Sequence, residues 1–168
     1  KNYDLTTPSW LSRKQYDLTD KAVWNREKTR IKERRTLYDH WSPPCRTFSS
    51  APRVTPFRTK DCPFGQGVEN WKVENDSELA VKTCALAKMK HYLGDMFSIE
   101  HPDLSPIWEM ECYKELASLP GVFFVTWDNC EFGVTWRHRQ RIPTNCPWLV
   151  AISRDCEKAT DPDHPKHD

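Results

Sequence analysis

The pattern of apolar and polar residues predicts three helices. Apolar residues recur at helical spacing over 21–35, directly after Asp20, a residue type that caps helix N-termini. A second apolar stripe runs over 68–92, and Gly94 stands close to the C-cap position. A third helix is expected over 104–119, where Pro106 falls in the first turn.

Between these helices lie short segments rich in β-branched and aromatic residues. Strands are expected over 36–41, 95–100, 122–127 and 148–152. Residues 132–141 are expected to pair with a neighbouring strand as a hairpin. The alternation of strands and helices along the chain is typical of an α/β fold.

Composition indicates a single domain with long loops and several tryptophans in its core. The chain has 168 residues, which suits a single domain, expected over 1–150 and followed by a polar tail over 151–168. Its 13 prolines against 5 glycines indicate irregular, Pro-rich loops, the longest over 46–68. Several of the 8 tryptophans are expected in the core, namely Trp41, Trp71, Trp108, Trp127, Trp136 and Trp148.

Charge and cysteine usage narrow the class of protein. Lys and Arg number 25 against 24 for Asp and Glu, so a net charge of +1 does not by itself indicate a nucleic-acid binder. No apolar run approaches the roughly 18 residues that a membrane span requires. The 7 cysteines are odd in number, widely spaced and without a secretory signal, which favours reduced thiols in an intracellular protein, nuclear or cytoplasmic.

Two residues able to do chemistry follow predicted strands. Cys45 comes directly after Pro43 and Pro44, and because each proline fixes the backbone angle φ, the thiol is expected on a rigid turn. Glu100 ends the strand expected over 95–100. Sites in open α/β sheets lie beyond the carboxyl ends of strands, so Cys45 and Glu100 are candidates for an active site.

Three short motifs resemble, in chain order, those of the C5-cytosine DNA methyltransferases. Residues 42–45 read Ser-Pro-Pro-Cys with Phe-Ser at 48–49, similar to the family's Pro-Cys-Gln-x-Phe-Ser. Residues 99–102 read Ile-Glu-His-Pro where the family has Glu-Asn-Val, and residues 137–141 read Arg-His-Arg-Gln-Arg where it has Gln-x-Arg-x-Arg. The resemblance covers residues 16–145.

The resemblance implies a fold and a reaction. The fold would be a Rossmann-like methyltransferase half with a mostly parallel sheet. The Cys45 thiolate would attack C6 of a cytosine flipped out of the DNA, and Glu100 would contact N3 of that base. Arg139 and Arg141 would hold the base carbonyl and orient the Cys45 loop.

The same resemblance implies a methyl donor and contacts to DNA. The donor would be S-adenosylmethionine, with Asp17 and Pro43 as cofactor-binding residues. Contacts to the nucleic acid would come from Arg46, Arg137 and His138.

The chain also departs from the family. The Gly-rich donor loop, Phe-x-Gly-x-Gly, has no counterpart, because no glycine precedes Gly65. The sequence therefore predicts a truncated or degenerate catalytic segment that works with other segments or subunits of a larger protein.

Two alternatives remain open. One is a non-enzymatic nucleic-acid-binding or assembly module of a larger mobile-element or viral protein, in which Arg137, Arg139 and Arg141 contact phosphates. The other is a different thiol enzyme that pairs Cys45 with His40 or His101.

The chain also contains residues that could bind zinc. Cys156, His164 and His167 are residue types that bind zinc, and Cys130 or Cys146 would complete a tetrahedral set. The spacing between Cys156 and His164 is not that of a zinc finger, so the sequence favours a polar tail without zinc, and no metal ligand is assigned.

Overall fold

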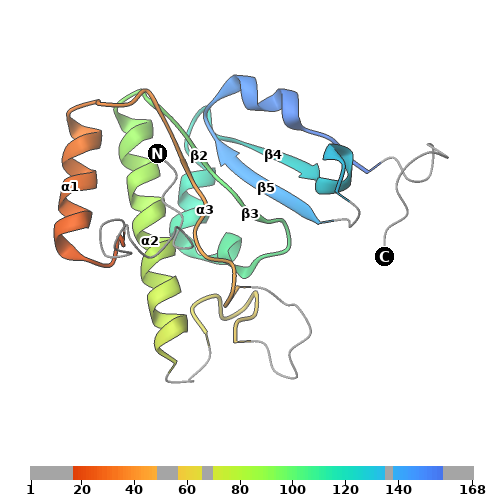
Figure 1. The fold of residues 1–168 in the computed structure, drawn as a ribbon, viewed down its shortest axis with the longest axis horizontal. Coiled ribbons are helices and arrows are strands. Elements are labelled where there is room, and N and C mark those ends of the chain that lie inside the picture. The colour runs from red at the N-terminus through yellow and green to blue at the C-terminus, as the bar shows by residue number, and fades with distance from the viewer. Residues whose placement is uncertain (1–16, 49–56, 66–69, 135–137, 157–168) are drawn as a thin grey trace.

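The computed structural model describes residues 17–48, 57–65, 70–134 and 138–156 (Figure 1). The helices are α1 (Lys21–Lys32), α2 (Trp71–Tyr92) and α3 (Glu111–Ala117), with 3₁₀ turns η2 (Pro106–Glu109), η3 (Asn129–Phe132) and η4 (Pro147–Ile152). The strands are β1 (Tyr38–Trp41), β2 (Met96–Ile99), β3 (His101–Pro102), β4 (Phe123–Asp128) and β5 (Arg139–Thr144). The sequence thus predicted the order of the main helices and strands.

Capping residues fix where the two long helices begin. Asp20 accepts hydrogen bonds from the backbone N–H groups of Ala22 (2.7 Å) and Val23 (3.1 Å), which confirms its expected role. Asn70 caps α2 by accepting from the N–H of Lys72 at 3.0 Å, so this helix begins at Trp71 rather than at residue 68. None of the helices in the described ranges is long and apolar enough to cross a membrane.

Two expected elements differ from the structure. The helix expected over 104–119 is divided into η2 and α3, with Met110 extended between them. The strand expected over 148–152 is wrong, because Pro147 opens the 3₁₀ turn η4 there. Its side chains lie outside the core, and Trp148 is 59 % exposed.

The sheet is mixed, which corrects the expectation of a mostly parallel sheet. Among the described strands, β1 and β2 form the parallel pair, whereas β5 pairs antiparallel with β2, β3 and β4. A parallel pair needs a long crossover, which α2 provides between β1 and β2. The short connection between β4 and β5 instead makes a hairpin, as the sequence predicted.

The directions of the strands bring several of their ends together. Because β5 lies between β2 and β4 and is antiparallel to both, β1, β2 and β4 all run the same way (Figure 1). One end of the sheet, called here the carboxyl edge, is therefore where β3 and β4 end and β5 begins, and β1 and β2 run toward it. Both the segment that leads to Cys45 and the residue pair Glu100–His101 lie at this edge.

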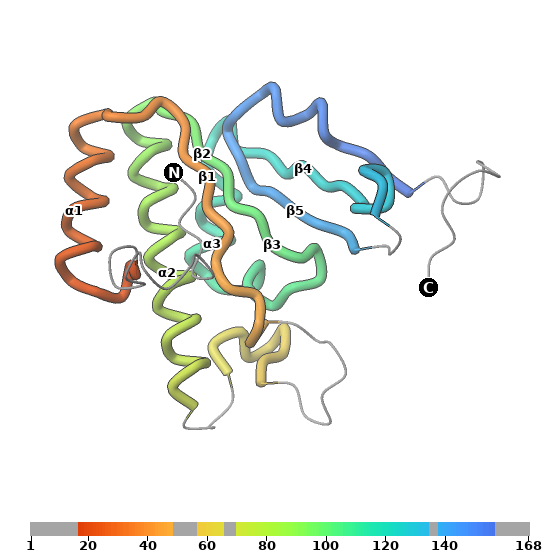
Figure 2. Tube along the Cα trace, viewed as in Figure 1, coloured from red at the N-terminus to blue at the C-terminus, as the bar shows by residue number. Residues whose placement is uncertain are grey.

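The helices cover one face of the sheet. Trp41, Phe97 and Ile99 point from β1 and β2 into a core shared with α2 and α3, and the tube view shows α1 and α2 running side by side next to the sheet (Figure 2). The tryptophan prediction holds for Trp41 and Trp108, which are 7 % and 9 % exposed.

The prediction is wrong for other tryptophans. Trp71 is 66 % exposed, and Trp148 is exposed as well. Trp71 lies in the first turn of α2, where Arg46 and Lys72 place their cations over its ring. Trp127 is half-buried, and Trp136 lies outside the described residues.

A buried cation joins α2 to the start of β1. Lys90, which is fully buried, donates to the carbonyl of Thr36 and lies 3.4 Å from Asp39 and 3.5 Å from Asp95. Arg34 adds a second cation, 2.8 Å from the other oxygen of Asp95. The two carboxylates therefore share Lys90, and each has an arginine as well, because Arg30 lies 2.9 Å from Asp39.

We predict that Lys90→Met destabilises the fold by about 3 kcal/mol, because it removes the buried cation that the buried Asp95 and the partly exposed Asp39 share. The matched control is Lys88→Met on the same helix, whose ammonium pairs with the exposed Glu115 at 2.5 Å. That variant should lose at most about 1 kcal/mol. Urea denaturation followed by circular dichroism measures both, and equal losses would contradict the assigned role of Lys90.

Candidate active site

A buried carboxylate on α2 holds the loop that carries Cys45. Asp76 is fully buried and accepts a hydrogen bond from the Thr47 hydroxyl at 2.8 Å. Arg46 binds the same carboxylate through Nε and Nη2, at 3.1 and 2.8 Å. The two residues that follow Cys45 closely, Arg46 and Thr47, are thus fixed to the helix layer by one acidic group.

Arg58 completes this anchor from a segment farther along the chain. Its guanidinium is buried, donates to the Thr47 hydroxyl at 3.0 Å and to the carbonyl of Val73 at 2.7 Å, and lies 3.8 Å from the centre of the Phe48 ring. Burial lowers the pKa of Arg58 to about 10, so the group still carries its charge at neutral pH. Neither Asp76 nor Arg58 was singled out from the sequence.

The Cys45 thiol reaches solvent at the carboxyl edge. Partial burial raises its pKa, and the charges of Glu100 and Asp76 raise it further. The thiol is therefore protonated at neutral pH. This is the reverse of the thiolate-stabilising surroundings that activate many catalytic cysteines.

Glu100 lies beside the segment that carries the thiol. The Ser42 hydroxyl, three residues before Cys45, donates to Oε2 of Glu100 at 2.5 Å. The structure therefore brings the Cys45 loop and Glu100 together, as the sequence predicted for two strand ends. The contact follows from the parallel register, in which the N–H of Glu100 donates to the carbonyl of Trp41.

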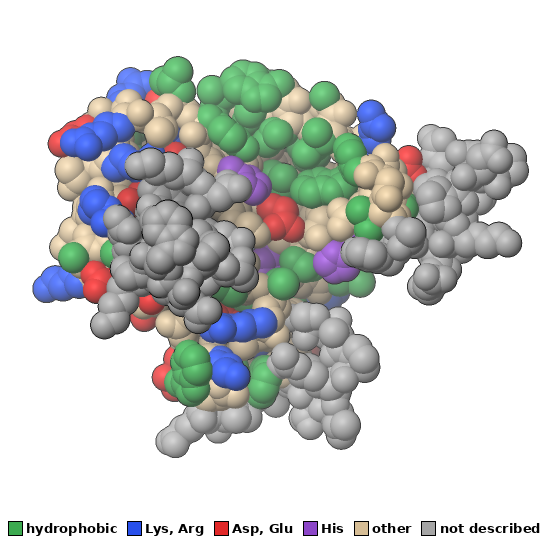
Figure 3. All heavy atoms as spheres, viewed as in Figure 1, with side chains coloured by type: hydrophobic (Ala, Val, Ile, Leu, Met, Phe, Trp, Pro, Cys, Tyr) green, Lys and Arg blue, Asp and Glu red, His purple; other side chains and the backbone are tan. Residues whose placement is uncertain are grey.

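A row of polar side chains continues from this pair along the sheet. Ser98 shares its hydroxyl with the phenol of Tyr38 at 2.6 Å and with Nδ1 of His40 at 2.7 Å. These residues alternate along β1 and β2 and so share the face that does not carry the core. In the space-filling view, histidine and acidic side chains lie close together on one face, bordered by hydrophobic ones (Figure 3).

The two histidines near the loop are held neutral. Burial lowers the pKa of His40, although the charge of Glu100 opposes this effect. His101 is buried edge-on to the rings of Phe48 and Trp108, and burial lowers its pKa to about 3. Across the described ranges, no hydrogen bond joins either imidazole to the Cys45 sulfur, which a cysteine–histidine enzyme would require.

Arg139 and Arg141 lie at and near the same edge but point to the other face. Arg141 pairs in register with His101, whereas Glu100 follows the orientation of Ser98. Arg141 donates to Asp103 at 2.6 Å and places its guanidinium 5.2 Å from the ring centre of Phe124. The structure thus unites Cys45 with Glu100 and directs both arginines elsewhere.

Acidic partners surround Arg139. Its guanidinium donates to Asp128 at 3.1 Å and lies 2.7 Å from Asp155, while Nε is 3.7 Å from Asp103. Although burial opposes it, the hydrogen bond to Asp155 and the nearby acidic charges raise the pKa of Arg139. The sequence showed the arginines but not these acids, because Asp103 and Asp155 lie far from Arg139 along the chain.

The other residues that the sequence assigned to the site lie in different parts of the fold. Asp17 accepts from the N–H and hydroxyl of Thr19, at 2.9 and 2.8 Å, in a turn before α1, and the strand expected before it lies outside the described residues. Pro43 is buried behind the Cys45 loop, and Nδ1 of the exposed His138 lies 2.8 Å from the Gln140 amide. Arg137 lies outside the described residues.

Comparisons with protein-family models, with curated proteins and with solved structures find no match for this chain. Its function is therefore inferred from the chemistry of its own residues.

We predict that Glu100→Gln speeds alkylation of Cys45. Removing the Glu100 charge lowers the pKa of the thiol, so a larger fraction is thiolate at pH 8 and the rate with iodoacetamide rises a few-fold. Peptide mass spectrometry over a pH series follows Cys45 separately from the other cysteines.

The control for this prediction is Glu111→Gln at the start of α3, which should leave the Cys45 rate unchanged. An unchanged rate in Glu100→Gln as well would mean that the carboxylate does not act on the thiol.

Proposed function

We propose that this chain is a catalytic segment of the C5-cytosine methyltransferase type, in which Cys45 adds to a cytosine of a nucleic acid, most simply DNA, beside Glu100. The observation that carries the proposal is the meeting of the Cys45 loop and Glu100 at one edge of the sheet, joined by the Ser42 hydrogen bond of 2.5 Å. The motifs that resemble this family are the ones that supply the two residues.

The strand directions support a Rossmann-like half. Three strands, β1, β2 and β4, run the same way, and α2 makes the crossover between the first two. Sites in such sheets lie beyond the carboxyl ends of the strands. Glu100 lies between β2 and β3, and Cys45 lies after β1 on a loop that the buried Asp76 and Arg58 keep in place.

The proposed step is a nucleophilic addition to the ring. The Cys45 sulfur forms a bond to C6 of the cytosine, and the electron pair of the C5–C6 double bond moves through C4 toward N3. N3 takes a proton from the Glu100 carboxyl group, so the adduct gains no net negative charge. Glu100 takes up that proton from solvent as the base binds, the thiol proton leaves to solvent, and the reverse sequence restores the base.

The charge state of Glu100 links the proton transfer to N3 with the attack by the Cys45 sulfur. A neutral Glu100 donates to N3, and the same neutrality removes a charge that raises the pKa of Cys45. Binding of a base against Glu100 would thus favour the thiolate at the moment when it is needed.

The methyl donor does not fit the described residues. No glycine precedes Gly65, so the loop through which the family's backbone approaches the donor is missing. The carboxylate of Asp17 is engaged by Thr19 within its own turn. No step through S-adenosylmethionine is therefore derived, and donor binding would fall to another segment or subunit of a larger protein.

The two arginines are given no contact with the base. Arg139 and Arg141 pair with acidic side chains on the face opposite Glu100. These ion pairs also weaken the alternative of a non-enzymatic phosphate-binding surface, because phosphates would have to compete with carboxylates already in place.

The test needs no methyl donor. Once Cys45 is bound to C6, C5 takes a proton from water, and loss of the original hydrogen on reversal releases a label. The protein is incubated with duplex and single-stranded DNA that carries tritium at C5 of cytosine. Tritium release is expected from the wild type, none above background from Cys45→Ser, and a rate lower by about 100-fold or more from Glu100→Gln.

Cys62→Ser is the matched control, since it makes the same change at a half-buried thiol on another loop. It should release tritium like the wild type. Equal release from wild type and Cys45→Ser would overturn the proposal. A second assay with 5-fluorocytosine DNA and S-adenosylmethionine traps a covalent adduct only if methyl transfer also occurs.

A further inference from the structure

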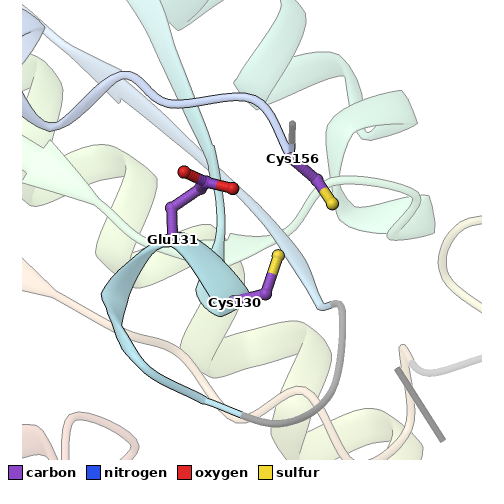
Figure 4. Close-up of side chains that lie close together, drawn as sticks. All are labelled: Cys130, Glu131 and Cys156. Carbon is purple, nitrogen blue, oxygen red and sulfur yellow. The ribbon is translucent and has the colours of Figure 1, made fainter. Parts of the chain in front are cut away.

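Two cysteines that are distant in the sequence meet beyond the end of β4. Cys130 lies in η3, directly after the strand, and is 3 % exposed, whereas Cys156 comes from the last described segment. Their sulfur atoms and a carboxylate oxygen of Glu131 all lie within 4.8 Å of one another. Figure 4 shows the two thiols turned toward each other, with the Glu131 carboxylate nearby.

Backbone pairing between residue 154 and β4 brings Cys156 close to Cys130. Residue Arg154 forms a parallel bridge with Trp127, and its carbonyl accepts from the N–H of Asp128 at 2.9 Å. The N–H of Cys156 then donates to the carboxylate of Asp128 at 2.8 Å. Main-chain contacts along the edge of β4 and one hydrogen bond to the Asp128 carboxylate thus hold Cys156 near Cys130.

We propose that Cys130, Cys156 and Glu131 form a binding site for a zinc ion, which reverses the expectation from the sequence. Two thiolates and one carboxylate are ligands of zinc, and the thiolates select it over magnesium or calcium, which prefer oxygen. The three donors leave one position of a tetrahedral ion for a further ligand.

The geometry is close to what zinc requires. With about 2.3 Å from zinc to sulfur and about 2.0 Å to oxygen, tetrahedral ligand atoms lie roughly 3.5–3.8 Å apart. Contacts within 4.8 Å need only a small adjustment of side chains to reach these values. Cys146, the other candidate from the sequence, is buried at the start of η4 and is not a member of this group.

The electrostatic surroundings favour a cation. Burial raises the pKa of Cys130, and the hydrogen bond with Cys156 and the charges of Asp128 and Glu131 raise it further. Without a metal these groups oppose the thiolate, whereas a divalent cation would stabilise two thiolates and a carboxylate together. Metal binding should therefore release protons from the thiols.

Such an ion would also stabilise the neighbouring ion pairs of Arg139. Asp128 accepts from both Cys156 and Arg139, and Asp155 pairs with Arg139 from the residue before Cys156. Fixing Cys156 to Cys130 would hold the 154–156 segment against β4 and keep both acids on Arg139. The role assigned to zinc is structural and independent of the proposed reaction at Cys45.

The test uses the full chain, stripped of metal under reducing conditions and titrated with cobalt(II), a spectroscopic substitute for zinc. One cobalt per chain is expected, with the charge-transfer absorption of thiolate ligands, and zinc should displace it. Cys156→Ser should weaken binding by about 100-fold or more, since even residues that only support a ligand cost 10–100-fold. Glu131→Gln should weaken it less.

Cys62→Ser is again the matched control and should bind like the wild type. Zinc should raise the melting temperature and protect Cys130 and Cys156 from alkylation in the wild type, but not in Cys156→Ser. Circular dichroism of the metal-free variant checks that it folds.

Three results would overturn the site. These are no thiolate-to-cobalt absorption in the wild type, equal affinity in Cys156→Ser, or a Cys130–Cys156 disulfide whose reduction yields a protein that binds no metal.

Discussion

The position of the Cys45 thiol depends on one buried carboxylate. Asp76 has no solvent around it, so its charge is tolerated only because Arg46 and the Thr47 hydroxyl bind it from the loop after β1, with Arg58 behind Thr47. Those partners come from the residues next to Cys45. A loop that moved away would leave an unsolvated charge inside α2, and this cost keeps the thiol at the carboxyl edge beside Glu100. Pro43 and Pro44 restrict the backbone before Cys45. The ion pair between Arg46 and the buried Asp76 fixes the position of the turn.

The reversed strand β5 governs what else gathers at that edge. It lies between β2 and β4 and begins beside the end of β4, so Arg139 lies opposite Asp128 and next to the end of β3. The alternation of side chains along β5 then sends Arg139 and Arg141 to the face opposite Glu100. Proximity along the edge and convergence on one face are thus different properties. The three motifs lie near the same edge, whereas the arginines point to the face opposite Glu100, whose carboxylate contacts the Cys45 segment through Ser42.

The sequence predicted those features that depend on local patterns. Helix periodicity and the cap at Asp20 located α1, and the β-branched and aromatic run over 122–127 located β4. It also placed Cys45 and Glu100 together, because two strand ends are positioned by topology. It failed at 148–152, where an apolar run looks like a strand but Pro147 starts a turn. The partners of Arg139 and the meeting of Cys130 with Cys156 depend on tertiary packing between distant segments, for which spacing along the chain carries no signal.

The two thiol sites differ in how their charges are arranged, not in residue type. Cys45 and Cys130 both lie near carboxylates that raise the pKa of the thiol. At Cys45 the acids are separate: Asp76 is occupied by Arg46, and Glu100 is the group that a bound base would face. At Cys130 a second thiol and a carboxylate converge within a few ångströms on one point. An isolated thiol beside a proton donor suits attack on a ring carbon, whereas convergent soft donors suit a cation. The number of donors that share a point therefore distinguishes the thiol proposed to react from the two proposed to bind zinc.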